Sequence, residues 1–223
     1  MIELAVLDLA GTTVADDGIV EAAFADALGG RGLSSSEFRS AMEIAKETMG
    51  LSKIEVFRMI FEDDLDSASS VNLAFEDAYA ARVSSGEARP IPGAEVALDR
   101  LKSSGVLVGF TTGFSPRTRR LLLVELGWDD LADIALSPAD AGRGRPYPDM
   151  ILLSILQLGV GDVRSVAVAG DNPVDLESGS RAGAGIVAGV LTGVSDSVRL
   201  QTSRHTHIIG SIAEFPDLVE SVG

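Results

Sequence analysis

The sequence predicts an α/β protein: a parallel sheet with helices on both faces and an all-helical segment inserted near the start. Short runs of β-branched residues recur, and each is followed by Gly, Asp, Ser or Thr and then by helical periodicity. One long early stretch, by contrast, has no convincing strand. The chain has 223 residues and is 46% hydrophobic, which is sufficient for a large core.

Strand-like runs follow one another along the chain at residues 4–7, 106–110, 165–169, 185–191 and, more weakly, 134–136 and 207–209. Helical patterns follow them, one opened by Ser115-Pro116 and another with Pro173 as its first residue. This alternation favours a parallel sheet, whose ligands collect at the carboxyl ends of the strands. We therefore expect Asp8, Thr112 and Asp171 to lie at one edge of the sheet.

The early stretch without strands shows apolar periodicity typical of about four helices. Ser34-x-x-Glu37 and Ser52-x-x-Glu55 both match the capping box that begins a helix. Proline and glycine at the end of the stretch indicate a boundary. We expect a core domain formed by residues 1–15 and 90–223, and a helical cap domain formed by residues 16–89.

Charge and composition exclude several classes of function. With 18 Lys+Arg against 33 Asp+Glu, the net charge is −15, which disfavours nucleic acid as a partner. The absence of cysteine removes disulfides, thiol nucleophiles and Cys-zinc sites, and fits a cytoplasmic location. No apolar run approaches the ~18 residues of a membrane span, and no signal peptide is recognisable at the start.

Carboxylates follow two of the strand-like runs. Asp8 ends the first, and Gly11 allows nearby backbone N–H groups to turn toward an anion. Asp171 follows the third run and would face Asp8, and hard oxygen ligands of this kind suit Mg²⁺. Asp175, one helical turn later, would orient Asp171 or cap the helix. Taken alone, Asp8 is equally compatible with a turn or a helix cap.

Two other strand ends carry groups suited to an anion. Thr112 offers a hydroxyl and, with Gly113, backbone donors to a phosphoryl oxygen. Arg145 places a cation just before a helix, where it would neutralise both a nucleophile and a bound anion.

The order Asp8…Thr112…Arg145…Asp171-x-x-x-Asp175 resembles the four motifs of the haloacid dehalogenase superfamily of hydrolases. The resemblance spans nearly the whole chain. It implies a Rossmann-like core with a C1-type helical cap, and chemistry through an aspartyl phosphate.

The same resemblance implies a role for each matching residue. Asp8 would be the nucleophile, and Thr112 and Arg145 would stabilise the transferring oxygens. Mg²⁺ would be held by Asp8, the backbone carbonyl of Ala10 and Asp171.

Two segments resemble phosphonoacetaldehyde hydrolases (phosphonatases) in particular. Most phosphatases of the superfamily carry a second aspartate, a general acid, where this chain has Ala10, and phosphonatases also have alanine there. The segment from Met49 and Gly50 to Lys53 resembles their cap motif, whose lysine forms an imine with the substrate aldehyde. The imine turns the leaving group into an enamine, so that no acid is needed beside the nucleophile.

The position of Lys53 also favours reactivity. It follows Ser52 at the first position of a predicted helix, where the helix dipole disfavours a positive charge. We therefore expect a lowered pKa, although Glu55 opposes the shift.

Val56 and Phe114 depart from the phosphonatase pattern, which has histidine and tyrosine there. A phosphatase acting on a small phosphate ester therefore stays open as an alternative. A carbon–halogen hydrolase would not need Asp171. A non-catalytic phosphate-binding signalling protein is disfavoured, because nucleophile, cation and metal carboxylate are all present.

The resemblance further implies a homodimer through the caps, although a monomer is also compatible.

Overall fold

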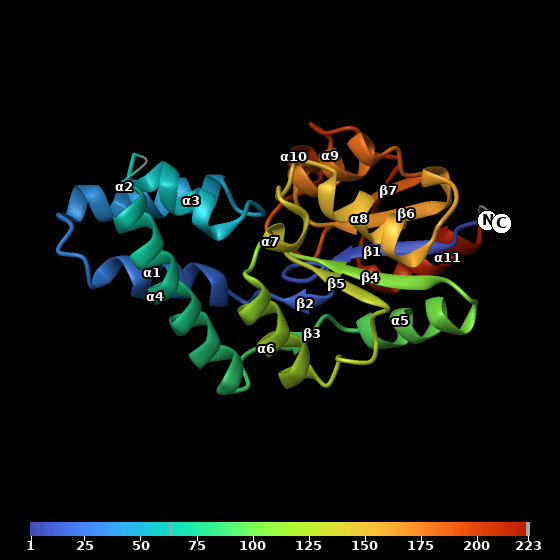
Figure 1. The fold of residues 1–223 in the computed structure, drawn as a ribbon, viewed down its shortest axis with the longest axis horizontal. Helices are drawn as coiled ribbons and strands as arrows, with labels where there is room; N and C mark the ends of the chain where they lie inside the picture. Colours follow the sequence, from blue (N-terminus) through green and yellow to red (C-terminus); the bar gives the residue numbers. More distant parts are fainter. Residues whose placement is uncertain (63, 222–223) are drawn as a thin grey trace.

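The structure is a computed structural model that describes residues 1–62 and 64–221, and a six-stranded sheet forms its core (Figure 1). The strand order is β5-β4-β1-β6-β7-β8, and every neighbouring pair is parallel. The strands are β1 (Leu4–Asp8), β4 (Leu107–Thr111), β5 (Ile134–Leu136), β6 (Val166–Gly170), β7 (Ile186–Val190) and β8 (His207–Ile209). All six lie within one residue of the predicted runs, and the predicted fold class is confirmed.

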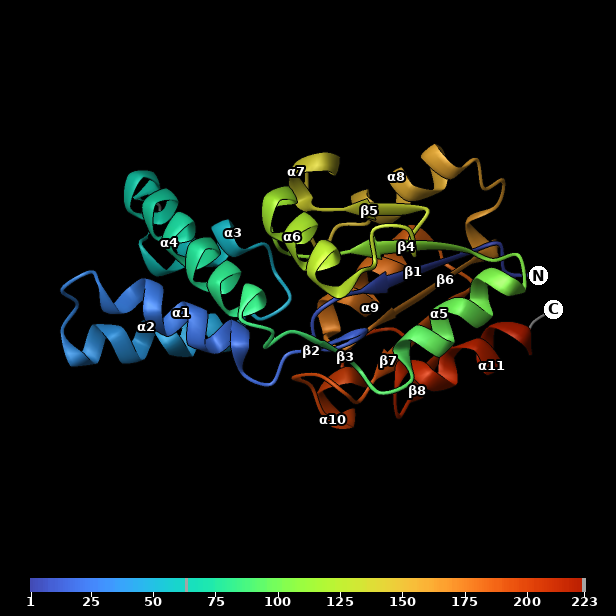
Figure 2. The ribbon, with the colours of Figure 1, turned by 90° about the horizontal axis from the view of Figure 1, so that it is seen from below.

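Helices cover both faces of the sheet because successive strand residues point to opposite sides. In β1, Leu4 and Val6 pack on α8 (Asp149–Leu158) and its neighbours, whereas Ala5 and Leu7 belong to a second apolar cluster. Figure 2 shows α8 on one side of the sheet and α5 and α11 on the other. The remaining core helices are α5 (Ala94–Ser103), α6 (Pro116–Leu126), α7 (Pro138–Ala141), α9 (Pro173–Ala182), α10 (Ser197–Leu200), α11 (Phe215–Glu220) and the 3₁₀ turns η1 (Val163–Ser165) and η2 (Ile212–Glu214).

The predicted starts of α6 and α9 are confirmed. Ser115 is the N-cap of α6, and its hydroxyl accepts the backbone N–H of Thr118. Pro173 is the first residue of α9, and Asn172 caps that helix. Among the described residues, no helix has the length and apolar content needed to cross a bilayer.

The helical insertion that the sequence predicts consists of four helices, and these lie beyond the carboxyl ends of the strands (Figure 1). They are α1 (Ile19–Gly29), α2 (Ser35–Glu47), α3 (Lys53–Ile60) and α4 (Leu65–Ser84). Three phenylalanines from three of these helices form their shared core, with ring centroids 4.6–6.0 Å apart: Phe24, Phe57 and Phe75.

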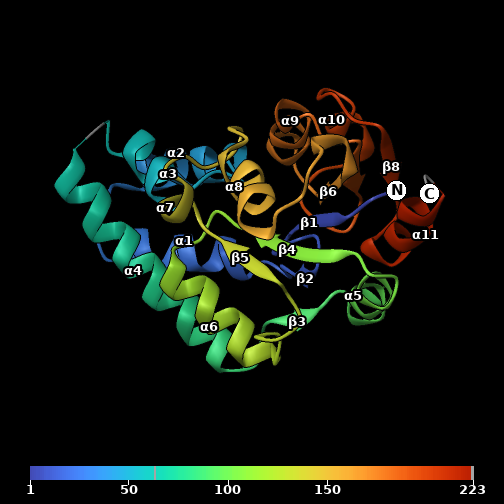
Figure 3. The same ribbon diagram turned by 45° about the vertical axis from the view of Figure 1, so that its right-hand side comes forward.

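A short two-stranded ribbon connects the insertion to the core. Here β2 (Val14–Ala15) pairs antiparallel with β3 (Arg89–Pro90), so the chain enters and leaves the four helices at neighbouring points (Figure 3).

One of the two predicted capping boxes is wrong. The first is present: Glu37 N–H donates to Ser34 Oγ at 3.3 Å, and Ser34 N–H donates to Glu37 Oε2 at 2.8 Å. Helix α3 also begins at Lys53 as predicted, but the side chain of Ser52 makes no capping hydrogen bond. The backbone N–H of Lys53 donates to the core, to the carbonyl of Gly113 at 3.3 Å. The N–H of Glu55, which a capping Ser52 side chain would bind, donates to the backbone carbonyl of Ser52 at 3.0 Å.

Candidate active site

The strand register brings the expected residues to one edge of the sheet. Leu7 pairs with Ala169, so Asp8 at the end of β1 lies beside the turn that carries Asp171. On its other side Asp8 pairs with Thr111, and Thr112 follows directly. Asp8, Thr112 and Asp171 are only 2–5% exposed, so this edge is a buried polar site.

Three buried carboxylates gather there. Asp8, Asp171 and Asp175 each offer an oxygen, and the three atoms lie within 4.8 Å of one another. Burial raises the pKa of Asp171 and of Asp175, and the negative charge of Asp8 adds to both increases. Such a cluster is unfavourable unless cations offset its charge.

Arg145 supplies one of these cations. Its guanidinium lies 2.7 Å from Asp8 Oδ1 and 2.7 Å from Asp175 Oδ1, and it donates to Thr111 Oγ1 at 2.9 Å. Burial alone would lower the pKa of Arg145, but the charges of Asp175 and Asp8 outweigh burial and raise it. Arg145 therefore stays charged and holds Asp8 in a defined position.

The position of the Asp171 carboxylate, next to Asp8, fits a site for a divalent metal. Val194 N–H donates to Asp171 Oδ2 at 2.8 Å, which orients this carboxylate. Backbone encloses it closely: a Cβ on Gly193 would lie 2.0 Å from Asp171 Oδ2, and one on Gly11 would lie 2.7 Å away. Asp8, Ala10 and Asp171 line the same small cavity. Carboxylate and carbonyl oxygens are the ligands that Mg²⁺ prefers, so these residues fit the ion.

The start of α9 positions the next two residues. Asn172 N–H donates to Asp175 Oδ2 at 3.1 Å, so Asp175 caps the helix while its other oxygen pairs with Arg145. Asn172 Oδ1 in turn accepts the N–H of Val174 at 3.3 Å. The side-chain N–H₂ of Asn172 is buried without a hydrogen-bond partner among the described residues and lines the small cavity, where it is available to a ligand.

Lys53 enters the same cavity, of about 30 Å³, from the cap. It is 7% exposed, and its Nζ lies 5.6 Å from the ring centroid of Phe24 and 5.4 Å from that of Phe114. Burial lowers the pKa of Lys53 to about 8, while the charges of Asp16 and Asp8 oppose the shift. The expected direction is therefore present, but its main cause is burial, which the position at a helix start did not reveal.

The loop before Lys53 packs tightly on the core. Gly50 has φ +96°, and a Cβ there would lie 2.8 Å from Val174 Cγ2. A Cβ on Gly113 would lie 2.5 Å from the carbonyl oxygen of Leu51. Met49, Gly50 and Gly113 all line the small cavity.

Thr112 lies in the small cavity, and the two residues that depart from the phosphonatase pattern, Val56 and Phe114, are both buried. Thr112 lines the cavity, and its Oγ1 accepts the N–H of Phe114 at 3.2 Å. Val56 is fully buried. The ring of Phe114 packs on Tyr79, with centroids 4.4 Å apart. Neither departure places an ionisable side chain near Lys53.

Sequence reasoning missed three contributors. Thr111 binds Arg145, but its hydroxyl could not be distinguished in advance from that of the adjacent Thr112. Asp16, the first residue of the predicted cap domain, lines the small cavity. The backbone at Val194 holds Asp171 and follows β7, so the rule that ligands collect at strand ends could have found it.

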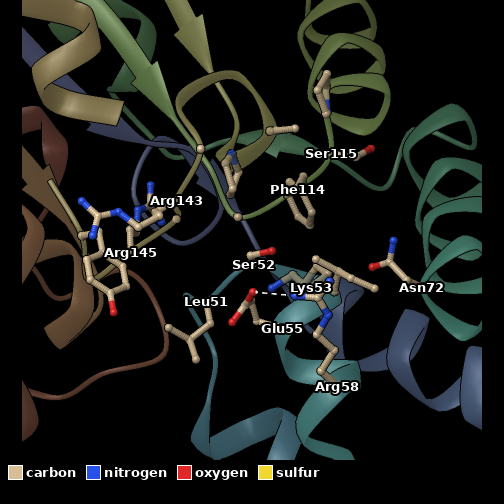
Figure 4. A pocket seen from close by; sticks show the side chains of 18 of the residues that line it. Leu51, Ser52, Lys53, Glu55, Arg58, Asn72, Phe114, Ser115, Arg143 and Arg145 are labelled. Carbon is tan, nitrogen blue, oxygen red and sulfur yellow. Dashed lines mark hydrogen bonds and ion pairs between the residues drawn. The ribbon is translucent and has the colours of Figure 1, made fainter. Parts of the chain in front are cut away.

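A larger pocket of about 520 Å³ adjoins the small cavity and lies between the cap and the loop before α8 (Figure 4). Four residues line both spaces: Lys53, Gly113, Phe114 and Arg145.

A parallel α/β core, a helical insertion over its strand ends and a buried site of carboxylates and cations define the class: this is an enzyme, a hydrolase. The chain belongs to the haloacid dehalogenase-like hydrolases, because the sequence profile of that family matches residues 2–183.

Relatives within this family carry a narrower name. The chain is 29% identical to a phosphonoacetaldehyde hydrolase of Nitratidesulfovibrio vulgaris, over 84% of this chain and 71% of that protein. It is 26% identical to a phosphonoacetaldehyde hydrolase of Bacteroides fragilis, over 99% and 97%. A phosphonoacetaldehyde hydrolase-like protein from Oleispira antarctica has the same fold, with a TM-score of 0.85, 23% identity and coverage of 99% and 92%.

Proposed function

We propose that this protein cleaves the carbon–phosphorus bond of phosphonoacetaldehyde or a related small phosphonate, with Mg²⁺ and an imine on Lys53. One observation carries the proposal: a buried lysine with a lowered pKa shares a cavity with the aspartate that ends β1. Ala10 supports it, because direct P–O hydrolysis would lack a general acid there. The names of the relatives point in the same direction.

Asp8, the Ala10 carbonyl and Asp171 are the residues that would hold Mg²⁺. When bound, the ion supplies positive charge that offsets the carboxylates and the phosphoryl oxygens. Thr112, Gly113 and Arg145 bind those oxygens from the protein side, and Asp175 positions Arg145.

The reaction begins on the cap side. The amine of Lys53 condenses with the substrate carbonyl, releasing water and leaving a protonated imine. An oxygen of Asp8 then attacks phosphorus as the carbon–phosphorus bond breaks, and the electron pair of that bond moves into the imine to form an enamine.

Two covalent intermediates, the enamine on Lys53 and the acyl phosphate on Asp8, are then hydrolysed to regenerate the free enzyme. A proton adds to the enamine carbon, and water hydrolyses the resulting imine to release the aldehyde and restore the Lys53 amine. A second water hydrolyses the acyl phosphate on Asp8 to release inorganic phosphate. Gly11, Met49 and Gly50 shape the cavity around these groups.

We further infer that residues 16–89 act as one lid over a core of residues 1–15 and 90–223. The ribbon of β2 and β3 supports this, because both connections of the lid lie side by side. Closure would exclude water and bring Lys53 toward Asp8. A homodimer and a cytoplasmic location stay predictions.

The test is release of acetaldehyde and phosphate from phosphonoacetaldehyde with Mg²⁺, comparing wild type with Lys53→Ala. We expect the variant to lose activity by on the order of 10⁴-fold or more, since no imine can form. Borohydride added during turnover should reduce the imine and attach the two-carbon fragment to Lys53, which mass spectrometry detects. Lys46→Ala, on the exposed side of α2, is the control and should retain activity.

Phosphate-ester hydrolysis is the second candidate, and the fully buried Val56 favours it because no proton carrier lies at that position. The same experiment separates the two functions. Turnover of a phosphate ester that survives Lys53→Ala, together with no release from phosphonoacetaldehyde by wild type, would establish the phosphatase.

A further inference from the structure

The larger pocket exceeds what phosphonoacetaldehyde needs. Its volume of about 520 Å³ falls within the range typical of small-molecule sites. It shares Lys53 and Phe114 with the small cavity, so the two spaces lie next to each other (Figure 4). The far end of phosphonoacetaldehyde is an aldehyde hydrogen, so a substrate that fills this pocket has a longer organic part beyond its carbonyl.

Two of the arginines that line this pocket, Arg58 and Arg143, are already paired with carboxylates. Arg58 Nη1 lies 3.2 Å from Glu55 Oε1. Arg143 binds both oxygens of Asp149, at 2.7 and 2.9 Å, and its guanidinium stacks over the ring of Tyr147. These cations are therefore poorly suited to capture a carboxylate on the substrate.

A carboxylate on α4 lacks such a partner. Glu76 lines the pocket and is 7% exposed. No lysine, arginine or histidine within residues 1–62 and 64–221 forms an ion pair with it. It accepts one hydrogen bond, from Asn72 Nδ2 at 3.2 Å. A buried carboxylate without a cation is unfavourable, so a positively charged ligand would stabilise it.

Asn72 adds a second free acceptor. Its Oδ1 is buried and makes no hydrogen bond within the described part of the chain. Figure 4 shows Asn72 projecting from α4 toward the pocket. Glu76 and Asn72 together present two acceptors and one uncompensated negative charge.

We propose that Glu76 and Asn72 bind an ammonium group at the far end of the substrate's organic part. The preferred substrate is then a small oxo-phosphonate that carries a primary amine beyond its carbonyl. The inference rests on the proposed function only in placing the phosphorus of the substrate at Asp8. An ammonium has several N–H donors and a full positive charge, and these satisfy both acceptors and the charge of Glu76.

Binding of unreactive analogues tests the inference without turnover. The ligands are ω-aminoalkylphosphonates with two to five carbons, each compared by calorimetry with the alkylphosphonate that has methyl in place of the amine. We expect one amine to bind Mg²⁺-loaded wild type about tenfold or more tightly than its methyl partner. Hydroxyl analogues should bind more weakly than the amines, and inorganic phosphate should displace every ligand.

Glu76→Gln keeps the shape of the side chain and should remove the preference for the amine, whereas Glu76→Asp should retain part of it. The matched control is Glu55→Gln, which removes a pocket carboxylate that is already paired and should keep the preference. Thermal unfolding checks that each variant folds.

Equal affinity for amine and methyl ligands in wild type would overturn this inference but leave the proposed function intact. A preference for the amine that survives Glu76→Gln, or that disappears in Glu55→Gln, would do the same. If neither series bound at all, the placing of phosphorus at Asp8 would fail, and the inference with it.

Discussion

Lys53 and Arg145 line the same cavity and are both buried, yet their pKa values shift in opposite directions. Arg145 has carboxylates of Asp8 and Asp175 at 2.7 Å, and their charges raise its pKa. Lys53 forms no ion pair with any residue of the described chain, so burial dominates and lowers its pKa to about 8. At pH 7 about 10% of Lys53 is then the free amine, against about 0.04% of an exposed lysine.

This difference predicts a pH dependence. The free amine is needed for the imine, so kcat/KM on phosphonoacetaldehyde should rise with pH and level off above about pH 8. The negative charge of Asp16 favours the ammonium form. We therefore expect Asp16→Asn to move the rising limb to lower pH, measured as the profile of kcat/KM.

Asparagine at position 16 can still accept the N–H of Val20, which Asp16 Oδ1 accepts at 3.0 Å. Asp17→Asn is the control, because Asp17 is exposed and pairs with Arg89 at the surface. A limb that stays in place, or moves to higher pH, in Asp16→Asn would show that Lys53 does not control the profile.

The loop before α3 determines where that helix begins and how the cap contacts the core. Gly50 approaches Val174 and Asn172 at the start of α9, and the N–H of Lys53 reaches the carbonyl of Gly113. Helix α3 thus obtains its first hydrogen bond from the core, and the placement of Lys53 depends on contact between the two parts of the chain.

Gly50→Ala should test this contact. The new Cβ would lie 2.8 Å from Val174 Cγ2 in a backbone conformation with φ +96°. We expect a loss of about 1–3 kcal/mol in the free energy of unfolding and a fall of about 10²-fold in kcat/KM, because Lys53 moves away from Asp8.

Gly86→Ala provides the matched control. Gly86 has a similar φ of +82°, but nothing lies within 4 Å of the place that a Cβ would occupy there, so only the backbone strain is shared. This variant should lose about 1–2 kcal/mol of stability and keep its activity. Equal activity in both variants would contradict a role for the Gly50 contact.

The whole molecule carries a net charge of −15, yet its site must accept an anion. The buried cations Lys53 and Arg145 supply part of the necessary positive potential. The three clustered carboxylates lower this potential, and without metal they repel one another in the buried site. A divalent ion would reduce that repulsion.

We expect Mg²⁺ to stabilise the protein, by about 2.7 kcal/mol at a concentration one hundred times its Kd, and EDTA to abolish turnover.

The pKa of Asp171 is raised in the folded protein, so the folded state holds more protons than the unfolded state. The free energy of unfolding without metal therefore falls as pH rises from 3.8, the ordinary pKa of an aspartate, toward the raised value. Since the proton competes with the ion, the increase in Tm from Mg²⁺ should be larger at pH 8 than at pH 6.

Asp171→Asn should abolish the response of Tm to Mg²⁺ and raise Tm in EDTA, because it removes a buried charge. Asp99→Asn, on the exposed face of α5, should respond as wild type does. A response that persists in Asp171→Asn would place the metal elsewhere.

The local sequence pattern was sufficient to predict much of the fold and some of the residues of the site. The β-branched runs predict all six strands of the main sheet. The signal is strongest for the four central strands, β4, β1, β6 and β7, because a strand buried on both faces must be apolar along its length. Asp8, Thr112 and Asp171 were recognisable because each follows such a run, and parallel strands end at one edge.

Contacts between distant segments decided the rest. The main cause of the low pKa of Lys53 is burial against the rings of Phe24 and Phe114, which depends on how the cap packs. Ser52 has the sequence of a capping residue, but its side chain makes no capping hydrogen bond, and the core carbonyl of Gly113 accepts the N–H of Lys53. Chain pattern therefore predicts which groups reach the site, whereas their charge and solvation depend on neighbours far away in sequence, which only the packed structure brings together.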